Sequence, residues 1–161
     1  MKYQNHIEEA AENNEQIEKL FQRLKKKKPK NLDGLFHEAH EKAFESIDCL
    51  ECANCCKTTS PIFRDIDIKR ISKKLKIGVA EFERTYLKMD EDDFWVLKSS
   101  PCAFLGDDNK CGIYDFRPQA CTEYPHTDQR KVVQVLDLTL ENIKICPAAA
   151  KITAEILGKI S

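Results

Sequence analysis

The sequence has few glycines, no long apolar run and no excess of charge of either sign. Its five glycines are never adjacent, which excludes a glycine-rich loop of the kind that binds phosphates. No apolar run approaches the ~20 residues that a membrane-spanning helix needs. The chain has 26 Lys and Arg against 27 Asp and Glu. This near-neutral balance excludes a protein that coats nucleic acid through its overall charge. We therefore expect neither a membrane nor a nucleic acid as a partner.

Cysteine is the residue that this chain has in excess, with eight in 161 residues. The first residues carry no apolar stretch after Lys2, which predicts no secretory signal and a reducing, cytoplasmic compartment. Eight thiols in such a compartment indicate metal ligands or redox groups more than a disulfide framework.

Apolar periodicity predicts a mainly helical α+β fold with short strands. Asp65 is the expected N-cap of one helix, Gly78 its C-terminal stop, and Pro147 the first residue of the last helix. The predicted helices cover residues 3–27, 34–47, 66–76, 80–88 and 147–160. The predicted strands are 94–97, which is aromatic and β-branched, and 132–138, where Val and Leu dominate.

We expect an N-terminal helical extension, residues 1–45, before a small metal-stapled cysteine-cluster domain, residues 46–161. The run Lys25–Lys28 is either a solvated helix end or a docking patch for an acidic protein partner. His37 and His40 lie three residues apart on one predicted helix, either on an exposed polar face or as metal ligands.

The first cysteine cluster is Cys49, Cys52, Cys55 and Cys56. A C-x-x-C turn lets two thiolates converge on one ion, and here the turn is doubled. Adjacent side chains diverge, so the spacing leaves open which of Cys55 and Cys56 is a ligand.

The second group is Cys102, Cys111 and Cys121. The turn-forming residues 106–109 predict a hairpin-like loop that presents Cys102 and Cys111 together. Cys146 stands apart and is the first candidate for a thiol that is only a small buried apolar side chain. His126 is either a solvated loop residue or a fourth ligand.

The motifs CxxCxxCC, DIDIKRISKKLKI, SPCAFL and KCGIYDFRPQACTEYP resemble, in this order, the YkgJ-type cysteine-cluster proteins. The resemblance covers about residues 47–127. It implies zinc or iron chelation, with an iron–sulfur cluster also suggested, and a biochemical role that is largely undefined. The positions that it implies as the signature are Cys49, Cys52, Cys55, Cys56, Cys102, Cys111 and Cys121, with the pairs Ile113-Tyr114 and Arg117-Pro118.

Soft thiolates favour zinc or iron–sulfur clusters over magnesium or calcium. Lys57, Lys110 and Arg117 lie near these cysteines in the sequence and are candidates to offset the thiolate charge, and Tyr114 is expected to pack over the cluster loops. Arg117 could equally brace its loop through Asp115 or a backbone carbonyl.

Three functions fit these features. The first is a metal-binding protein with a structural, storage or delivery role. The second is an iron–sulfur oxidoreductase or electron carrier. The third is an interaction module in which the metal only staples the fold and the N-terminal helix binds a partner. No Ser/His/Asp arrangement and no HExxH motif is present, so whether the protein is an enzyme stays open.

Overall fold

The computed structural model describes residues 2–160, which divide into two compact units. The helical unit is built from both ends of the chain, up to Cys52 and from Pro125 onward. The cysteine-rich unit is the continuous segment Ala53–Tyr124. No helix of the described residues combines the length and hydropathy that crossing a bilayer requires.

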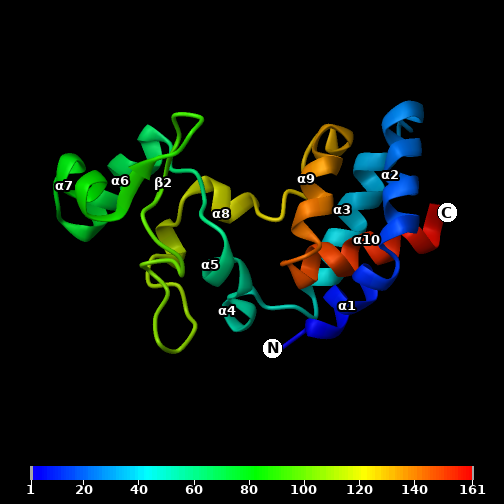
Figure 1. Ribbon diagram of the computed structural model, residues 1–161, viewed down its shortest axis with the longest axis horizontal. Helices are drawn as coiled ribbons and strands as arrows, with labels where there is room; N and C mark the ends of the chain where they lie inside the picture. Colours follow the sequence, from blue (N-terminus) through cyan, green and yellow to red (C-terminus); the bar gives the residue numbers. More distant parts are fainter. Residues whose placement is uncertain (1, 161) are drawn as a thin grey trace. The chain divides into compact units, whose positions relative to one another are not determined.

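The helical unit is a small bundle in which α10, drawn in red, packs against α1 and α3 (Figure 1). Its elements are α1 (Gln4–Glu12), α2 (Asn14–Lys27), α3 (Leu32–Phe44), α4 (Cys49–Cys52), the 3-10 helix η2 (Val132–Val135), α9 (Leu136–Asn142) and α10 (Pro147–Ile160). Its core is filled by aliphatic and aromatic side chains that are almost fully buried, including Ile17, Leu20, Phe21, Phe36, Val132, Leu136, Ile152 and Ile156. The predicted closing helix with Pro147 as its first residue is confirmed.

Two predictions for the helical unit are wrong. The helix predicted over 3–27 is two helices that meet at Asn13, whose side-chain amide donates to the carbonyl of Glu9 at 3.0 Å. The strand predicted over 132–138 is helical instead. The carboxylate of Asp33 accepts the N–H groups of Lys131 and Val132 at 2.8 and 2.9 Å, which fixes the start of this segment on α3.

The cysteine-rich unit packs short helices and one two-stranded sheet around a small aromatic core. Its elements are α5 (Asn54–Thr58), α6 (Asp65–Leu75), α7 (Val79–Tyr86), β1 (Leu87–Met89), β2 (Trp95–Leu97), the 3-10 helix η1 (Tyr114–Phe116) and α8 (Gln119–Glu123). The strands are antiparallel, with Leu87 opposite Leu97 and Met89 opposite Trp95. The mainly helical α+β fold is thereby confirmed.

The core of this unit lies beside the cysteine loops. Its buried members are Phe63, Ile68, Ile71, Phe82, Leu87, Leu97 and Ile113. Cys102, Phe104, Cys111 and Phe116 pack against this core while remaining partly exposed. The loops that carry two of the predicted ligands are therefore anchored by apolar contacts.

The ends of α6 and α7 differ from the prediction. Asp65 is the first residue of α6, and Asp67, two residues on, closes its start by accepting the Arg64 N–H at 2.9 Å. The left-handed residue that ends α6 is Lys76, while Gly78 precedes α7. The helix predicted over 80–88 stops at Tyr86, because Leu87 pairs with β2.

Candidate metal centre

Cys56 and Cys102 are joined through the backbone although they lie 46 positions apart in the sequence. The N–H of Cys102 donates to the carbonyl of Cys56 at 2.7 Å. Beside this bond, the hydroxyl of Ser100 donates to the carbonyl of Lys57 at 2.8 Å. The C-terminal part of the first cysteine cluster is thus fixed against the first residue of the second group.

Cys102 and Cys111 lie on the two arms of a tight loop, as the sequence predicts. Leu105 and Cys111 form an antiparallel bridge, and the N–H of Gly112 donates to the carbonyl of Phe104 at 2.8 Å. A Cβ atom at Gly112 would lie 3.3 Å from that same carbonyl oxygen, so the close approach favours glycine.

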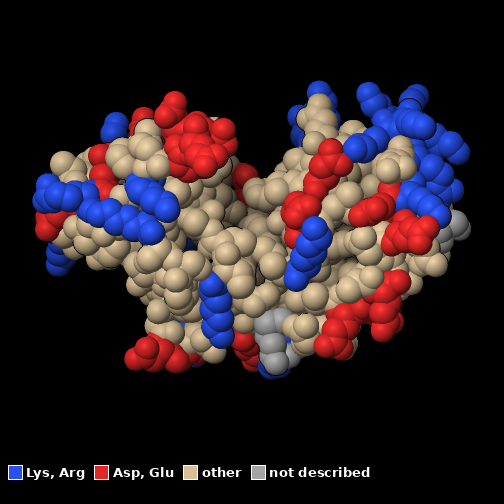
Figure 2. Space-filling model, viewed as in Figure 1, with Lys and Arg blue, Asp and Glu red and all other residues tan. Residues whose placement is uncertain are grey.

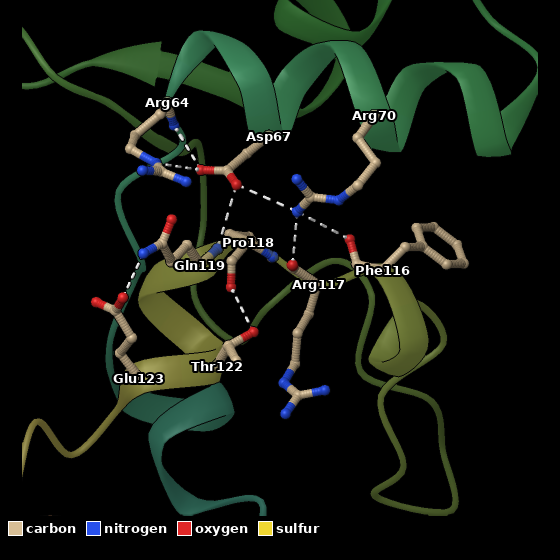
Figure 3. A network of polar contacts seen from close by, with 9 residues as sticks. All are labelled: Arg64, Asp67, Arg70, Phe116, Arg117, Pro118, Gln119, Thr122 and Glu123. Atoms are coloured by element: carbon tan, nitrogen blue, oxygen red, sulfur yellow. Dashed lines mark hydrogen bonds and ion pairs between the residues drawn. The ribbon is translucent and has the colours of Figure 1, made fainter. Parts of the chain in front are cut away.

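Cys121 is carried by α8, and the start of α8 is held by the buried carboxylate of Asp67 (Figure 3). One Asp67 oxygen accepts the Gln119 N–H at 3.2 Å and the Arg70 guanidinium at 3.1 Å. The Arg70 guanidinium also donates to the carbonyl of Arg117 at 2.8 Å. This network connects α6 to the segment that carries Cys121.

Asp67 was not singled out from the sequence. The sequence did contain a signal for this residue. An acidic side chain at the third position of a helix can accept the N–H of the N-cap residue, which is one of the two hydrogen bonds of a capping box. Its reach to α8 depends on tertiary structure and could not be seen from spacing.

Cysteine thiols of the cysteine-rich unit influence the pKa values of one another. The residues concerned are Cys56, Cys102, Cys111 and Cys121. Burial raises the pKa of Cys121 to about 12, and the charges of the other three cysteines add to the rise while Arg117 opposes it. Burial also raises the pKa of Cys102 and Cys111, and in both the charge of Cys56 contributes. The cysteine-rich unit therefore brings four thiols from three chain segments within electrostatic reach of each other.

Backbone N–H groups face two of these sulfur atoms. Those of Phe104 and Leu105 face Cys102, and that of Ile113 faces Cys111, each lowering the pKa of its thiol against the effect of burial. Such donors stabilise a thiolate more than a thiol. Thiol donors with N–H groups aimed at them fit a thiophilic ion such as zinc or iron.

Cys55 and Cys56 differ in their surroundings. A hydrogen bond from the Cys55 side chain lowers the pKa of Cys56 to about 7, against the effect of burial. The charge of Cys56 is among the causes that raise the pKa of Cys102, Cys111 and Cys121.

Arg117 braces its loop through a backbone carbonyl, which is one of the two roles that the sequence suggested for it. Its guanidinium donates to the Tyr114 carbonyl at 2.6 Å and lies 4.0 Å from the centroid of the Tyr114 ring. Its charge also lowers the pKa of Cys111 and Cys121. Tyr114 therefore packs on the arginine, and Lys57 contributes the backbone carbonyl described above.

Cys49, Cys52 and Cys146 belong to the helical unit. Cys146 stands apart from the other cysteines in the sequence, and its thiol is buried, as the sequence predicts. Burial raises the pKa of Cys146 to about 12, and the charges of Cys49 and Cys52 add to the rise. Only the tertiary fold brings residue 146 back to residues 49–52, so no spacing signal could have shown it.

The two predicted histidine neighbours on α3 have separate partners. His37 pairs with Asp128 at 2.7 Å, and His40 contacts the hydroxyl of Thr127 at 2.8 Å. His37, Glu41 and Asp128 are exposed, and each offers a ligand atom within 4.8 Å of the others. Since His37 is paired to Asp128, whose carboxylate raises its pKa, we interpret this group as a surface ion pair.

A comparison with protein-family models matches residues 48–146 to the CxxCxxCC family, described as a "putative zinc- or iron-chelating domain". No curated protein and no solved structure matches the chain. The matched range covers both thiol groups described above.

Proposed function

From the premise that this chain belongs to the CxxCxxCC family, we propose that it binds zinc or iron through a four-thiolate site made by Cys56, Cys102, Cys111 and Cys121. Four thiolates complete either a structural zinc site or an iron–sulfur cluster. In this proposal Cys56 is the ligand of the adjacent pair, and Cys55 is its hydrogen-bonding neighbour.

The observation that supports the proposal is that three segments of one unit bring Cys56, Cys102, Cys111 and Cys121 within electrostatic reach of each other. The Cys102–Cys56 backbone hydrogen bond, the loop between Cys102 and Cys111, and the Asp67 network each fix one of these segments. Each contact is independent of the others, so the convergence does not depend on a single interaction.

The role that we propose for this metal is structural. In the described part of the chain, no helix or strand between β2 and α8 is longer than η1, which has three residues. A small apolar core stabilises this segment. A metal that joins α5, the Cys102–Cys111 loop and α8 would add tertiary links to it. A closed four-thiolate site also leaves no open position for a hydrolytic water.

The test is metal analysis of the full chain purified anaerobically. We expect stoichiometric zinc or iron in the wild type and loss of that metal from the four-thiolate site in Cys111→Ser. Thr122→Ser is the matched control, because Thr122 neighbours Cys121 on α8 but carries no thiol. A wild-type protein that holds no metal after reconstitution would refute the proposal.

The alternative is an iron–sulfur oxidoreductase or electron carrier at the same four thiolates. It predicts broad visible absorption and acid-labile sulfide after anaerobic reconstitution with iron and sulfide. A colourless protein that binds zinc stoichiometrically favours the structural role.

The interaction-module alternative depends on the lysines of α2. Lys25, Lys26 and Lys27 form its last turn, and Figure 2 shows basic side chains gathered over this helix. The opposite face of α2 is buried in its own unit, so the lysine face is the part available for an acidic partner. Lys26→Glu with Lys27→Glu should abolish capture of an acidic protein and leave the bound metal unchanged if this alternative holds.

A further inference from the structure

Three side chains with nitrogen or oxygen ligand atoms meet on the surface of the helical unit. His37 and Glu41 are four residues apart in α3, so they lie on one face of this 13-residue helix. Asp128 belongs to the segment that precedes η2, 91 positions from His37 in the sequence. One ligand atom of each residue lies within 4.8 Å of the others. An imidazole and two carboxylates are thus brought together by the tertiary fold.

The position of Asp128 is fixed by contacts other than its own. Thr127, just before it, is fully buried, and its hydroxyl contacts Nδ1 of His40 at 2.8 Å. A few residues after it, the N–H of Val132 donates to the carboxylate of Asp33 at 2.9 Å. His40 and Asp33 both belong to α3. The segment that carries Asp128 is therefore held on α3 from both sides, independently of the Asp128 ion pair.

The chemistry of the three groups suits one class of ion. Imidazole nitrogen together with carboxylate oxygen binds divalent first-row transition ions such as zinc and nickel. Bonds of about 2.0–2.2 Å to one zinc ion place its ligand atoms roughly 3–4 Å from one another. The spread of at most 4.8 Å in this group is close to that geometry. All three residues are exposed, so their side chains can rotate the remaining distance and water can complete the coordination.

The ion pair described above is compatible with such a site. Nδ1 of His37 lies 2.7 Å from a carboxylate oxygen of Asp128, so the contact directs these two groups toward each other. An ion that binds both would take the place of the proton between them, and this proton would leave to solvent. The pair is therefore the metal-free state of the same group, with two ligands already side by side.

We propose that His37, Glu41 and Asp128 bind a divalent transition-metal ion of the zinc and nickel class on the helical unit, with water as the remaining ligands. This inference goes beyond the proposed function, because the group uses no thiol and lies outside the cysteine-rich unit. It gives the helical unit an ion of its own, held by harder ligands than those of the four-thiolate site.

The test is titration of the purified full-length chain with Ni²⁺, followed by NMR of its backbone amides and by calorimetry. We expect this paramagnetic ion to broaden the signals of α3 around His37 and those of Thr127 and Asp128. Changing a partner of a metal ligand costs about 10–100-fold in affinity, so removing a ligand should cost about tenfold or more. His37→Ala and Asp128→Ala should each weaken Ni²⁺ binding by this amount and abolish the broadening.

A pair of variants separates ligation from general attraction of a cation. Glu41→Gln and Glu38→Gln each remove one exposed carboxylate from α3, and only Glu41 belongs to the group. We expect weaker Ni²⁺ binding in Glu41→Gln and unchanged binding in Glu38→Gln. Equal weakening in the two variants, or no broadening near His37 in the wild type, would overturn the proposed site.

The two metal proposals fail separately. Cys111→Ser removes a ligand of the four-thiolate site and should leave the Ni²⁺ broadening near His37 unchanged. His37→Ala should keep the zinc or iron with which the chain is purified. Broadening near His37 that disappears in Cys111→Ser would overturn the independence of the two sites and with it this inference.

Discussion

Asp67 is the residue through which the scaffold of the cysteine-rich unit holds the Cys121 segment. Its side chain is fully buried and accepts hydrogen bonds from Arg64, Arg70 and the N–H of Gln119. Burial opposes ionisation of this carboxyl, but the hydrogen bonds outweigh burial and hold its pKa below the usual range. Its charge is therefore compensated in the folded protein.

Replacing Asp67 with Asn should lower the free energy of unfolding of this unit by about 1–3 kcal/mol, because an amide cannot accept all of these hydrogen bonds. The measurement is denaturant unfolding followed by fluorescence of Trp95, the single tryptophan, which lies in β2 of the same unit. Asp65→Asn is the control, since Asp65 is exposed at the start of the same helix. An equal loss in both variants would contradict the role of Asp67.

The same residue predicts a pH dependence. A carboxyl whose pKa is lowered by folding contributes stability above its unfolded pKa, about 3.9, and that stability is lost as the pH falls through the folded pKa. The difference in unfolding free energy between wild type and Asp67→Asn should thus be full at pH 7 and shrink below about pH 4. A difference that stays constant from pH 7 to pH 3 would show that ionisation of Asp67 is not involved.

For single residues, the sequence indicated which side chains are candidate ligands, but it said less about which of them lie together in the fold. Cys102 and Cys111 could be placed together because a turn of Gly106 to Asn109 separates them. The neighbours of Cys146 could not, because they come from the other end of the helical unit. The proposal of Cys56 over Cys55 also rests on a contact that spacing does not show, the backbone hydrogen bond of Cys102 to Cys56.

Among the secondary-structure elements, α7 connects the core to the cysteine loop. Phe82 of α7 is fully buried, and its ring lies 6.1 Å from those of Phe63 and Phe104, centroid to centroid. Phe104 belongs to the loop that carries Cys102 and Cys111. The position of the loop therefore depends on the aromatic packing of a helix that carries no cysteine.

Phe82→Ala should destabilise the cysteine-rich unit by about 3–5 kcal/mol, because it leaves a cavity in the centre of this core. Zinc affinity should fall as well, since the loop loses one of its supports. Trp95 fluorescence and zinc titration measure the two effects. Phe82→Leu keeps most of the volume and should lose less of both; full zinc affinity in Phe82→Ala would show that the loop is held by other contacts.

Amphipathic helices were predicted well because their apolar spacing is a local property, as α3 and α10 illustrate. The segment 132–138 was assigned wrongly because its valines favour strands, whereas the carboxylate of Asp33 and the burial of Val132 and Leu136, four residues apart, select a helix. β1 was missed because its leucine continues the apolar pattern of α7.

For the whole molecule, the proposed four-thiolate site would make stability depend on metal content. Removing zinc or iron with a chelator should lower the unfolding free energy of the cysteine-rich unit on the order of several kcal/mol, since ligation and folding are coupled. Thermal unfolding followed at Trp95, with and without the chelator, measures this change. Restoring zinc should restore the transition, and a transition that the chelator leaves unchanged would contradict a structural metal.

The division of the chain has a consequence for its biosynthesis. The cysteine-rich unit is continuous, whereas the helical unit needs α10, its last helix, to cover α1 and α3. During synthesis the complete cysteine-rich unit would therefore leave the ribosome before α10. Until α10 follows, the apolar faces of α1 and α3 would stay uncovered. If the four-thiolate site binds metal as proposed, loading of the cysteine-rich unit could therefore precede closure of the helical unit.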